Sequence, residues 1–208
     1  MNEMTLEEIY VLNRALDGRD IFGLPSFREI GGSEMMIHSV KEQLIRKGLL
    51  ESESSFTMKG VQAVKHMEDY KNAQKYIQLG SLFIGIKKDQ DTAISLVRRG
   101  IPQEFEFQAL NTGDSFTQLC AIYPFLSQKT KEPEAANEYE MKYEELIEFY
   151  GLTIDNTLYL ATYTAEGEGL TDEIFFPAED RVCLYDRKTD TVTRPFTGTE
   201  KIIQERMA

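Results

Sequence analysis

The stretch SLFIGIKKDQDTAISLVRRGIPQEFEF, residues 81–107, decides the fold of this chain. It contains three short apolar segments, 81–86, 92–97 and 104–107, separated by polar connections. The third alternates Phe with Glu, as a strand with one buried face does. Short polar connections favour neighbouring strands that run antiparallel. The stretch therefore predicts a three-stranded antiparallel meander in the middle of the chain.

A second set of strands is predicted further along the chain, at 157–164, 173–176, 181–185 and 191–196. Residues 186–190 have the composition of a hairpin turn between the last two strands. A helix is expected before each strand set, so the two halves of the chain have a similar order of elements. We expect the two meanders to join into one central antiparallel sheet, with helices on a face and at the ends. The predicted fold class is α+β.

The expected helices lie at 5–16, 33–47, 58–78, 114–126, 137–150 and 200–207. Thr5 with Glu8 three positions later has the pattern of a capping box, and Ser33 is a suitable N-cap for the second helix. Two short strands, 49–51 and 55–57, are predicted after that helix. A helix followed by such a pair resembles a small winged-helix unit, so the N-terminal part is expected to be winged-helix-like.

Residues 127–136, SQKTKEPEAA, have the composition of a linker. We expect one α+β domain over 1–208, with an N-terminal half at 1–126 and a C-terminal half at 137–208. No residue-level repeat relates the halves, so their similarity is one of architecture.

The composition restricts the class of protein. With 208 residues, 41% of them hydrophobic, the chain is long enough to bury a core. Its longest mainly apolar run, 79–86, is far shorter than the roughly 20 residues of a membrane helix. Residues 1–8 are acidic and lack the pattern of a secretory signal. We therefore expect a cytoplasmic protein without direct membrane insertion, in which Cys120 and Cys183 are reduced.

The net charge of −12 is concentrated in one stretch. Residues 132–180 carry 14 Asp or Glu and one Lys. Two interpretations stay open: a solvated surface that keeps the protein soluble, or a surface that attracts a basic partner.

The sequence lacks the common signatures of catalysis. It has no glycine-rich phosphate loop and no Gly-x-Ser-x-Gly elbow. Its two histidines, His38 and His66, lie on expected helices. A hydrolase with either histidine as base stays open, as does a glycosidase-like pair of carboxylates, whose spacing exists only in three dimensions. We expect no enzyme, no cofactor and no metal site.

A winged-helix unit raises DNA binding as an alternative function. The candidate recognition helix carries Lys41, Arg46 and Lys47 against Glu34 and Glu42. A recognition helix normally presents more cationic and amide side chains than this. A DNA-binding regulator with an effector domain is therefore the second hypothesis, and nucleic acid is not the expected partner.

The order of elements resembles a known family. A first helix leads to VKEQLIRKGLLE, residues 40–51, then a long helix and two rounds of strands separated by an acidic helix. This arrangement resembles the EspG-like chaperones of ESX, or type VII, secretion systems, and among them the EsaE-type chaperones of a secreted toxin. The resemblance implies a central antiparallel sheet flanked by helical bundles. It also implies a cytoplasmic chaperone that binds a secreted toxin or small helical protein and delivers it to the membrane ATPase of the secretion machinery.

In EspG-like proteins a loop between central strands takes part in binding the client. The comparable loop here is RRGIPQ, residues 98–103, and the resemblance implies that Arg98, Arg99, Ile101 and Pro102 bind the client. Arginine and an apolar anchor suit an interface. An ordinary hairpin loop is the alternative interpretation of the same residues.

Overall fold

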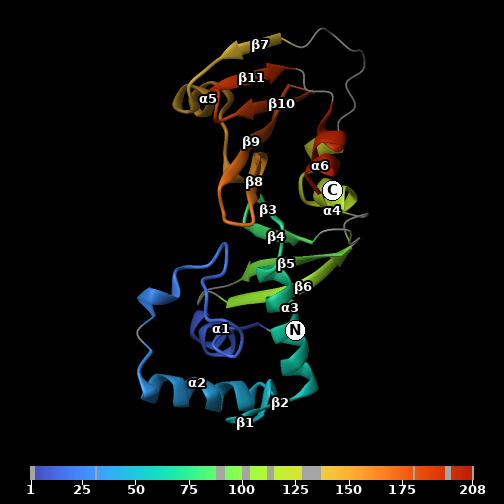
Figure 1. Ribbon diagram of the computed structural model, residues 1–208. Helices are drawn as coiled ribbons and strands as arrows, with labels where there is room; N and C mark the ends of the chain where they lie inside the picture. Colours follow the sequence, from blue (N-terminus) through green and yellow to red (C-terminus); the bar gives the residue numbers. More distant parts are fainter. Residues whose placement is uncertain are drawn as a thin grey trace. The chain divides into compact units, whose positions relative to one another are not determined.

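The computed structural model describes residues 3–30, 32–87, 92–99, 104–111, 115–127, 137–179, 181–194 and 198–207. Its helices are α1 (Leu6–Asn13), α2 (Glu34–Arg46), α3 (Met58–Lys71), α4 (Ser115–Ile122), α5 (Tyr143–Tyr150) and α6 (Thr199–Met207), with short 3₁₀ turns η1 (Phe27–Glu29), η3 (Pro124–Ser127) and η4 (Ile154–Asn156). The strands are β1 (Leu50–Ser52), β2 (Ser55–Phe56), β3 (Lys75–Leu79), β4 (Leu82–Ile86), β5 (Thr92–Arg99), β6 (Glu104–Asn111), β7 (Asn137–Glu140), β8 (Leu158–Thr164), β9 (Gly169–Ala178), β10 (Arg181–Asp186) and β11 (Thr191–Arg194). Figure 1 shows these elements along the chain.

The expected α+β class with one large antiparallel sheet is confirmed. Among the described residues, nine strands form this sheet in the order β6-β5-β4-β3-β8-β9-β10-β11-β7, and β1 and β2 form a separate hairpin. The chain divides into two compact units, residues 1–74 with 81–110 and residues 75–80 with 111–208. Residues 111–126, which the sequence analysis placed in the N-terminal half, belong to the second unit. None of the helices in the described part of the chain is long and apolar enough to cross a membrane.

The first unit begins with the capping box that the sequence predicts. The Thr5 side chain accepts a hydrogen bond from the Glu8 backbone, and Glu8 Oε2 accepts one from the Thr5 backbone at 2.8 Å. Ser33 caps α2 as expected. Met4 pairs with Phe105 of β6 through two backbone hydrogen bonds of 2.8 Å. The helices expected at 5–16 and 33–47 and the β1–β2 hairpin are present, and the winged-helix assignment remains a prediction.

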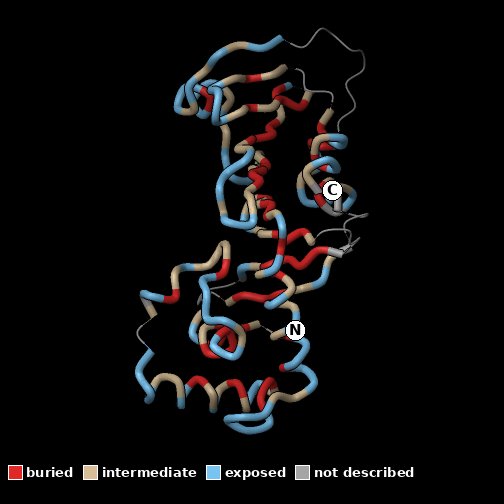
Figure 2. The backbone as a smooth tube through the Cα atoms, viewed as in Figure 1, coloured by how far each residue is buried: buried red, intermediate tan, exposed pale blue. Residues whose placement is uncertain are grey.

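The second unit is built around β3, β8, β9, β10, β11 and β7. On one face of these strands, α5 buries Leu146 against a cluster that includes Phe176, Cys183 and Val192. Figure 2 shows this buried layer in red. The helix α6 lies on the opposite face of these strands. Arg206 of α6 contacts Glu173 at 3.0 Å. Ile174 belongs to the cluster beneath α5, and the side chain of its neighbour Glu173 points to the other face of the sheet.

The prediction of one helix over 58–78 is wrong at its end. α3 stops at Lys71, and Lys75–Leu79 forms β3, which pairs with β8. On α3, Ala63 and Met67 are buried, whereas Val61 is 49% exposed. Ile77 continues the helical spacing of the apolar residues before it, but it is fully buried in β3, which pairs with β8. Tertiary contacts therefore decide the structure of this segment against its local pattern.

The prediction of an acidic helix over 137–150 is also wrong in its first part. Asn137–Glu140 is β7, and the helix α5 begins only at Tyr143. The segment alternates a carboxylate with Tyr139, and this alternation matches a strand whose two faces differ. The predicted linker at 127–136 lies outside the described residues except for Ser127, which ends η3.

Candidate binding site

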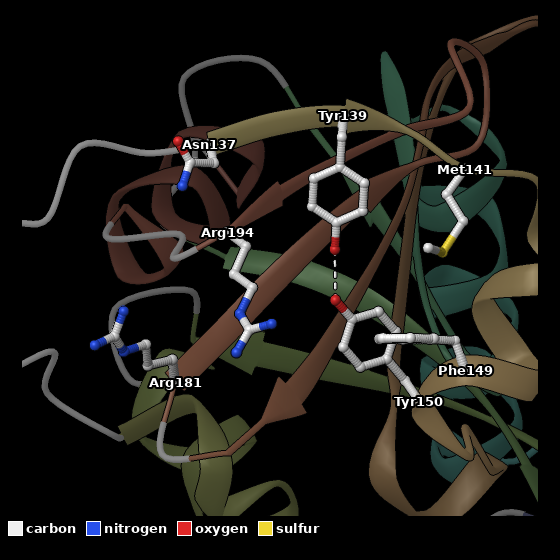
Figure 3. A pocket seen from close by; sticks show the side chains of 7 residues that line it. All are labelled: Asn137, Tyr139, Met141, Phe149, Tyr150, Arg181 and Arg194. Carbon is white, nitrogen blue, oxygen red and sulfur yellow. Dashed lines mark hydrogen bonds between the residues drawn. The ribbon is translucent and has the colours of Figure 1, made fainter.

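A pocket of about 490 Å³ lies at the β7 end of the second unit. Its lining comes from β7, α5, β10, β11 and the β7–α5 connection, with the residues Asn137, Tyr139, Met141, Phe149, Tyr150, Arg181 and Arg194. Figure 3 shows these seven side chains, which we call the aromatic–arginine pocket. The strand register assembles it, because Asn137 lies opposite Arg194 and Tyr139 lies opposite Val192. Side chains that are directly opposite in a ladder point to the same face.

The aromatic side of the pocket is fixed by a pair of tyrosines. The Tyr139 and Tyr150 hydroxyls hydrogen-bond to each other (Figure 3). Tyr150 also packs on Phe176 of the core, with ring centroids 4.9 Å apart. Burial and the hydrogen bond to Tyr150 raise the pKa of the Tyr139 hydroxyl, so Tyr139 stays protonated at physiological pH. Tyr139 therefore offers a polar but uncharged hydroxyl to a bound molecule.

Phe149 is the exposed edge of the same aromatic group. Its ring packs edge-to-face on Tyr150 at 4.9 Å, yet 72% of the residue is exposed. The helix ends directly after Tyr150, because Gly151 adopts a left-handed conformation at φ 60° that favours glycine. This end of α5 leaves the Phe149 ring beside the opening of the pocket, where a partner can cover it.

The cationic side of the pocket consists of Arg181 and Arg194. Arg194 contacts Glu179 Oε2 at 2.9 Å, and this hydrogen bond raises the pKa of its guanidinium. Glu179 lies in the turn between β9 and β10 at φ 58°, a conformation that side chains other than glycine rarely adopt. The turn thus holds a carboxylate against Arg194. Among the described residues no acidic side chain lines the pocket itself.

The described lining of the pocket is mainly aromatic and cationic. It has no His, Cys, Ser or carboxylate. In the described part of the chain no three His, Cys, Asp or Glu side chains gather as metal ligands. His38 and His66 belong to the first unit: His38 Nδ1 lies 3.2 Å from Glu53, and His66 Nδ1 lies 3.3 Å from the Phe107 carbonyl.

Cys183 lies in the core beneath the pocket and is expected to be unreactive. Burial raises its pKa to about 11, so almost no thiolate forms near neutral pH. In the native protein at pH 8, iodoacetamide should label the partly exposed Cys120 well before Cys183. After unfolding in guanidinium, both should react at similar rates. Mass spectrometry of timed samples checks this, and equal native rates would contradict the burial of Cys183.

The structure describes only part of the site predicted from the sequence. Arg98 is on β5 with its guanidinium 5.9 Å from the centre of the Phe105 ring. Arg99 is the last residue of β5, and its side chain lies outside the described residues. Ile101 and Pro102 also lie outside the described residues. Client binding by this loop therefore remains a prediction.

Two of the three candidate DNA contacts, Lys41 and Lys47, lie beside acidic side chains of the first unit. Lys47 Nζ donates to Glu8 Oε2 at 2.7 Å and lies 3.9 Å from Glu104. Lys41 lies 4.0 Å from Glu53. Paired cations of this kind are poorly available to phosphates.

Sequence reasoning missed the aromatic–arginine pocket. Its members are 57 positions apart at the extremes, Asn137 and Arg194, and only the strand register brings them together. The alternation around Tyr139 was the available signal, since it indicates a strand with one aromatic face.

Comparison with known proteins adds a family but no activity. None of the curated proteins matches this chain. A family model described as "Domain of unknown function (DUF5081)" matches residues 1–194. Because the match covers nearly the whole chain, the protein belongs to the DUF5081 family.

Proposed function

We propose that the protein works by binding another protein, and that the aromatic–arginine pocket with the exposed Phe149 is the contact surface. The observation that carries this proposal is the composition of the pocket: six of its seven lining residues are Tyr, Phe, Met or Arg. These types are enriched at protein interfaces, where aromatic and arginine side chains supply most of the binding energy. A ring as exposed as that of Phe149 gains much from being covered.

We propose further that the partner is a type VII secretion substrate, a toxin or a small helical protein. The support for this step is the resemblance of the whole chain to EspG-like chaperones. In this proposal the protein works in the cytoplasm as a chaperone and adaptor. It keeps the client soluble and delivers it to the membrane ATPase of the secretion machinery. The DNA-binding alternative is not proposed, because Lys41 and Lys47 contact acidic side chains.

The proposal predicts a large loss of binding when the exposed ring is removed. Phe149→Ser should weaken binding to the client at least tenfold, as expected for an aromatic anchor. Its effect on stability should be small, since the residue is mostly exposed. The matched control is Ile122→Ser on α4, which is 68% exposed and does not line the pocket.

The experiment has two stages. The tagged full-length protein is used to capture partners from native lysate, and mass spectrometry identifies a secreted protein that is recovered near 1:1. Calorimetry with that purified client then gives dissociation constants for the wild type and both variants. Recovery of no specific protein, or equal weakening by Phe149→Ser and Ile122→Ser, would overturn the assignment of this surface.

A further inference from the structure

β7 is the last strand of the large sheet and pairs with one neighbour only in the described part of the chain. The strand order ends at β7, and its partner there is β11 (Figure 1). An edge strand presents unpaired N–H and C=O groups, and an extended segment of another protein can pair with them as an added strand. The aromatic–arginine pocket opens at this same edge, because Tyr139 of β7 lines it.

The register shows which backbone groups of β7 point outward. The Met141 N–H donates to the Asp190 carbonyl at 2.9 Å, one position beyond the pair of Glu140 with Thr191. In an antiparallel ladder, hydrogen-bonded pairs alternate with pairs that are not hydrogen-bonded. Tyr139 therefore pairs with β11 through its backbone, whereas Glu138 and Glu140 direct their N–H and C=O groups away from β11. These two residues form the available edge.

The side chains of β7 divide between two faces. Asn137 and Tyr139 face the pocket, so Glu138 and Glu140 point to the opposite face. Both glutamates are exposed, and no ion pair of either one occurs among the described residues. Carboxylates on an edge strand repel a second acidic or apolar edge. They attract a strand that places cations directly opposite, since opposite charges form favourable cross-strand pairs.

We infer that β7 accepts an extended segment of the client as an added strand, with Lys or Arg opposite Glu138 and Glu140 and an apolar side chain between them. This inference rests on the proposed protein-binding function and specifies the chemistry of the bound segment. The apolar side chain lies opposite Tyr139, on the face where the aromatic–arginine pocket opens. The segment thus alternates basic and apolar residues, and its backbone pairs with Glu138 and Glu140.

A peptide of defined pattern tests this inference on the full-length protein. The probe is a fluorescein-labelled, acetylated and amidated peptide with the sequence Thr-Lys-Val-Lys-Val-Lys-Thr. The comparison peptide has Glu in place of each Lys. Fluorescence anisotropy measures binding to the wild type and to two variants. Glu138→Pro removes one outward N–H at an edge position, where proline is tolerated. The double variant Glu138→Lys with Glu140→Lys reverses the charge of the edge.

The expected pattern is specific. The Lys peptide binds the wild type, and its dissociation constant rises at least tenfold in both variants. The Glu peptide binds the double Lys variant more tightly than it binds the wild type. The control is Glu166→Lys with Glu168→Lys in the β8–β9 hairpin, which changes the net charge equally and should alter binding less than twofold. In hydrogen exchange, the peptide should slow the Glu138 and Glu140 amides and leave the Tyr139 amide unchanged.

Failure of this inference differs from failure of the proposed function. Absence of binding by the Lys peptide, or unchanged binding to Glu138→Pro, would overturn strand addition at β7. If the captured client also bound Glu138→Pro as tightly as the wild type, the protein-binding function would stand and the edge would not be its site. Recovery of no client from lysate would instead overturn the proposed function.

Discussion

Replacing Lys47 with methionine is expected to lower the free energy of unfolding by about 2 to 3 kcal/mol. The Glu8 carboxylate is fully buried, and the Lys47 ammonium contacts its Oε2 at 2.7 Å. Glu8 Oε1 has no hydrogen-bond partner in the described structure. The substitution would therefore leave a buried negative charge without its cation. The loss is smaller than the roughly 3–5 kcal/mol typical of breaking a fully buried pair, because 35% of the Lys47 side chain is exposed to solvent.

Arg46→Met is the matched control, since it removes the same charge one position earlier at an exposed site of α2. Its effect on stability should stay within about 0.5 kcal/mol. Urea unfolding of both variants gives the comparison, and equal stabilities would contradict a special role for Lys47. The same pair also tests the DNA hypothesis. If Arg46 and Lys47 were phosphate contacts, each substitution would weaken DNA binding in a gel shift at low salt. Neither substitution would then have to lower the free energy of unfolding.

Gly60→Ala is expected to destabilise the first unit by about 3 kcal/mol, although alanine is the better helix former. A Cβ at Gly60 would lie 1.9 Å from the Leu49 carbonyl oxygen and 3.2 Å from Phe56 Cδ1. The start of α3 cannot move away freely. Thr57 caps this helix and also donates from its hydroxyl to the Gly48 carbonyl at 2.7 Å. The hairpin and the helix would have to separate, with loss of these bonds.

Gly169→Ala provides the contrast for this substitution. The nearest atom to a Cβ at Gly169 is 4.0 Å away, on the Tyr163 ring, which is ordinary contact. For a chain of this length, about 3 kcal/mol corresponds to a decrease in Tm of roughly 6–12 °C. Thermal unfolding followed by circular dichroism should show this decrease for Gly60→Ala and little change for Gly169→Ala. A Gly60→Ala variant as stable as the wild type would show that the β1–β2 hairpin and α3 can separate at little cost in free energy.

Local signals predicted the parts of the fold that local interactions determine. The capping box of Thr5 and Glu8 and the cap at Ser33 involve residues three positions apart, and both are present. The meander of 81–107 and the hairpin turn at 186–190 follow from alternation and polar connections, which are also short-range.

The errors arose where distant strands determine the structure. Lys75–Leu79 continues an apolar spacing that suits a helix, but pairing with β8 makes it a strand. Asn137–Glu140 likewise becomes a strand through β11. The aromatic–arginine pocket depends on both the β7 register and the end of α5 at Gly151. Contacts of this kind are formed between segments far apart in sequence, so no window of residues contains them.

The course of β3 has a consequence for synthesis on the ribosome. Gln78 of β3 pairs with Ala161 of β8, which is 83 positions later in the chain. At about 5–20 residues per second, the nascent chain waits on the order of 4–17 s before this partner exists. Throughout that interval β3 lacks the strand that covers one of its edges. Two of its residues, Tyr76 and Ile77, are buried in the finished protein. Until then, the edge of β3 that β8 covers presents unpaired backbone N–H and C=O groups.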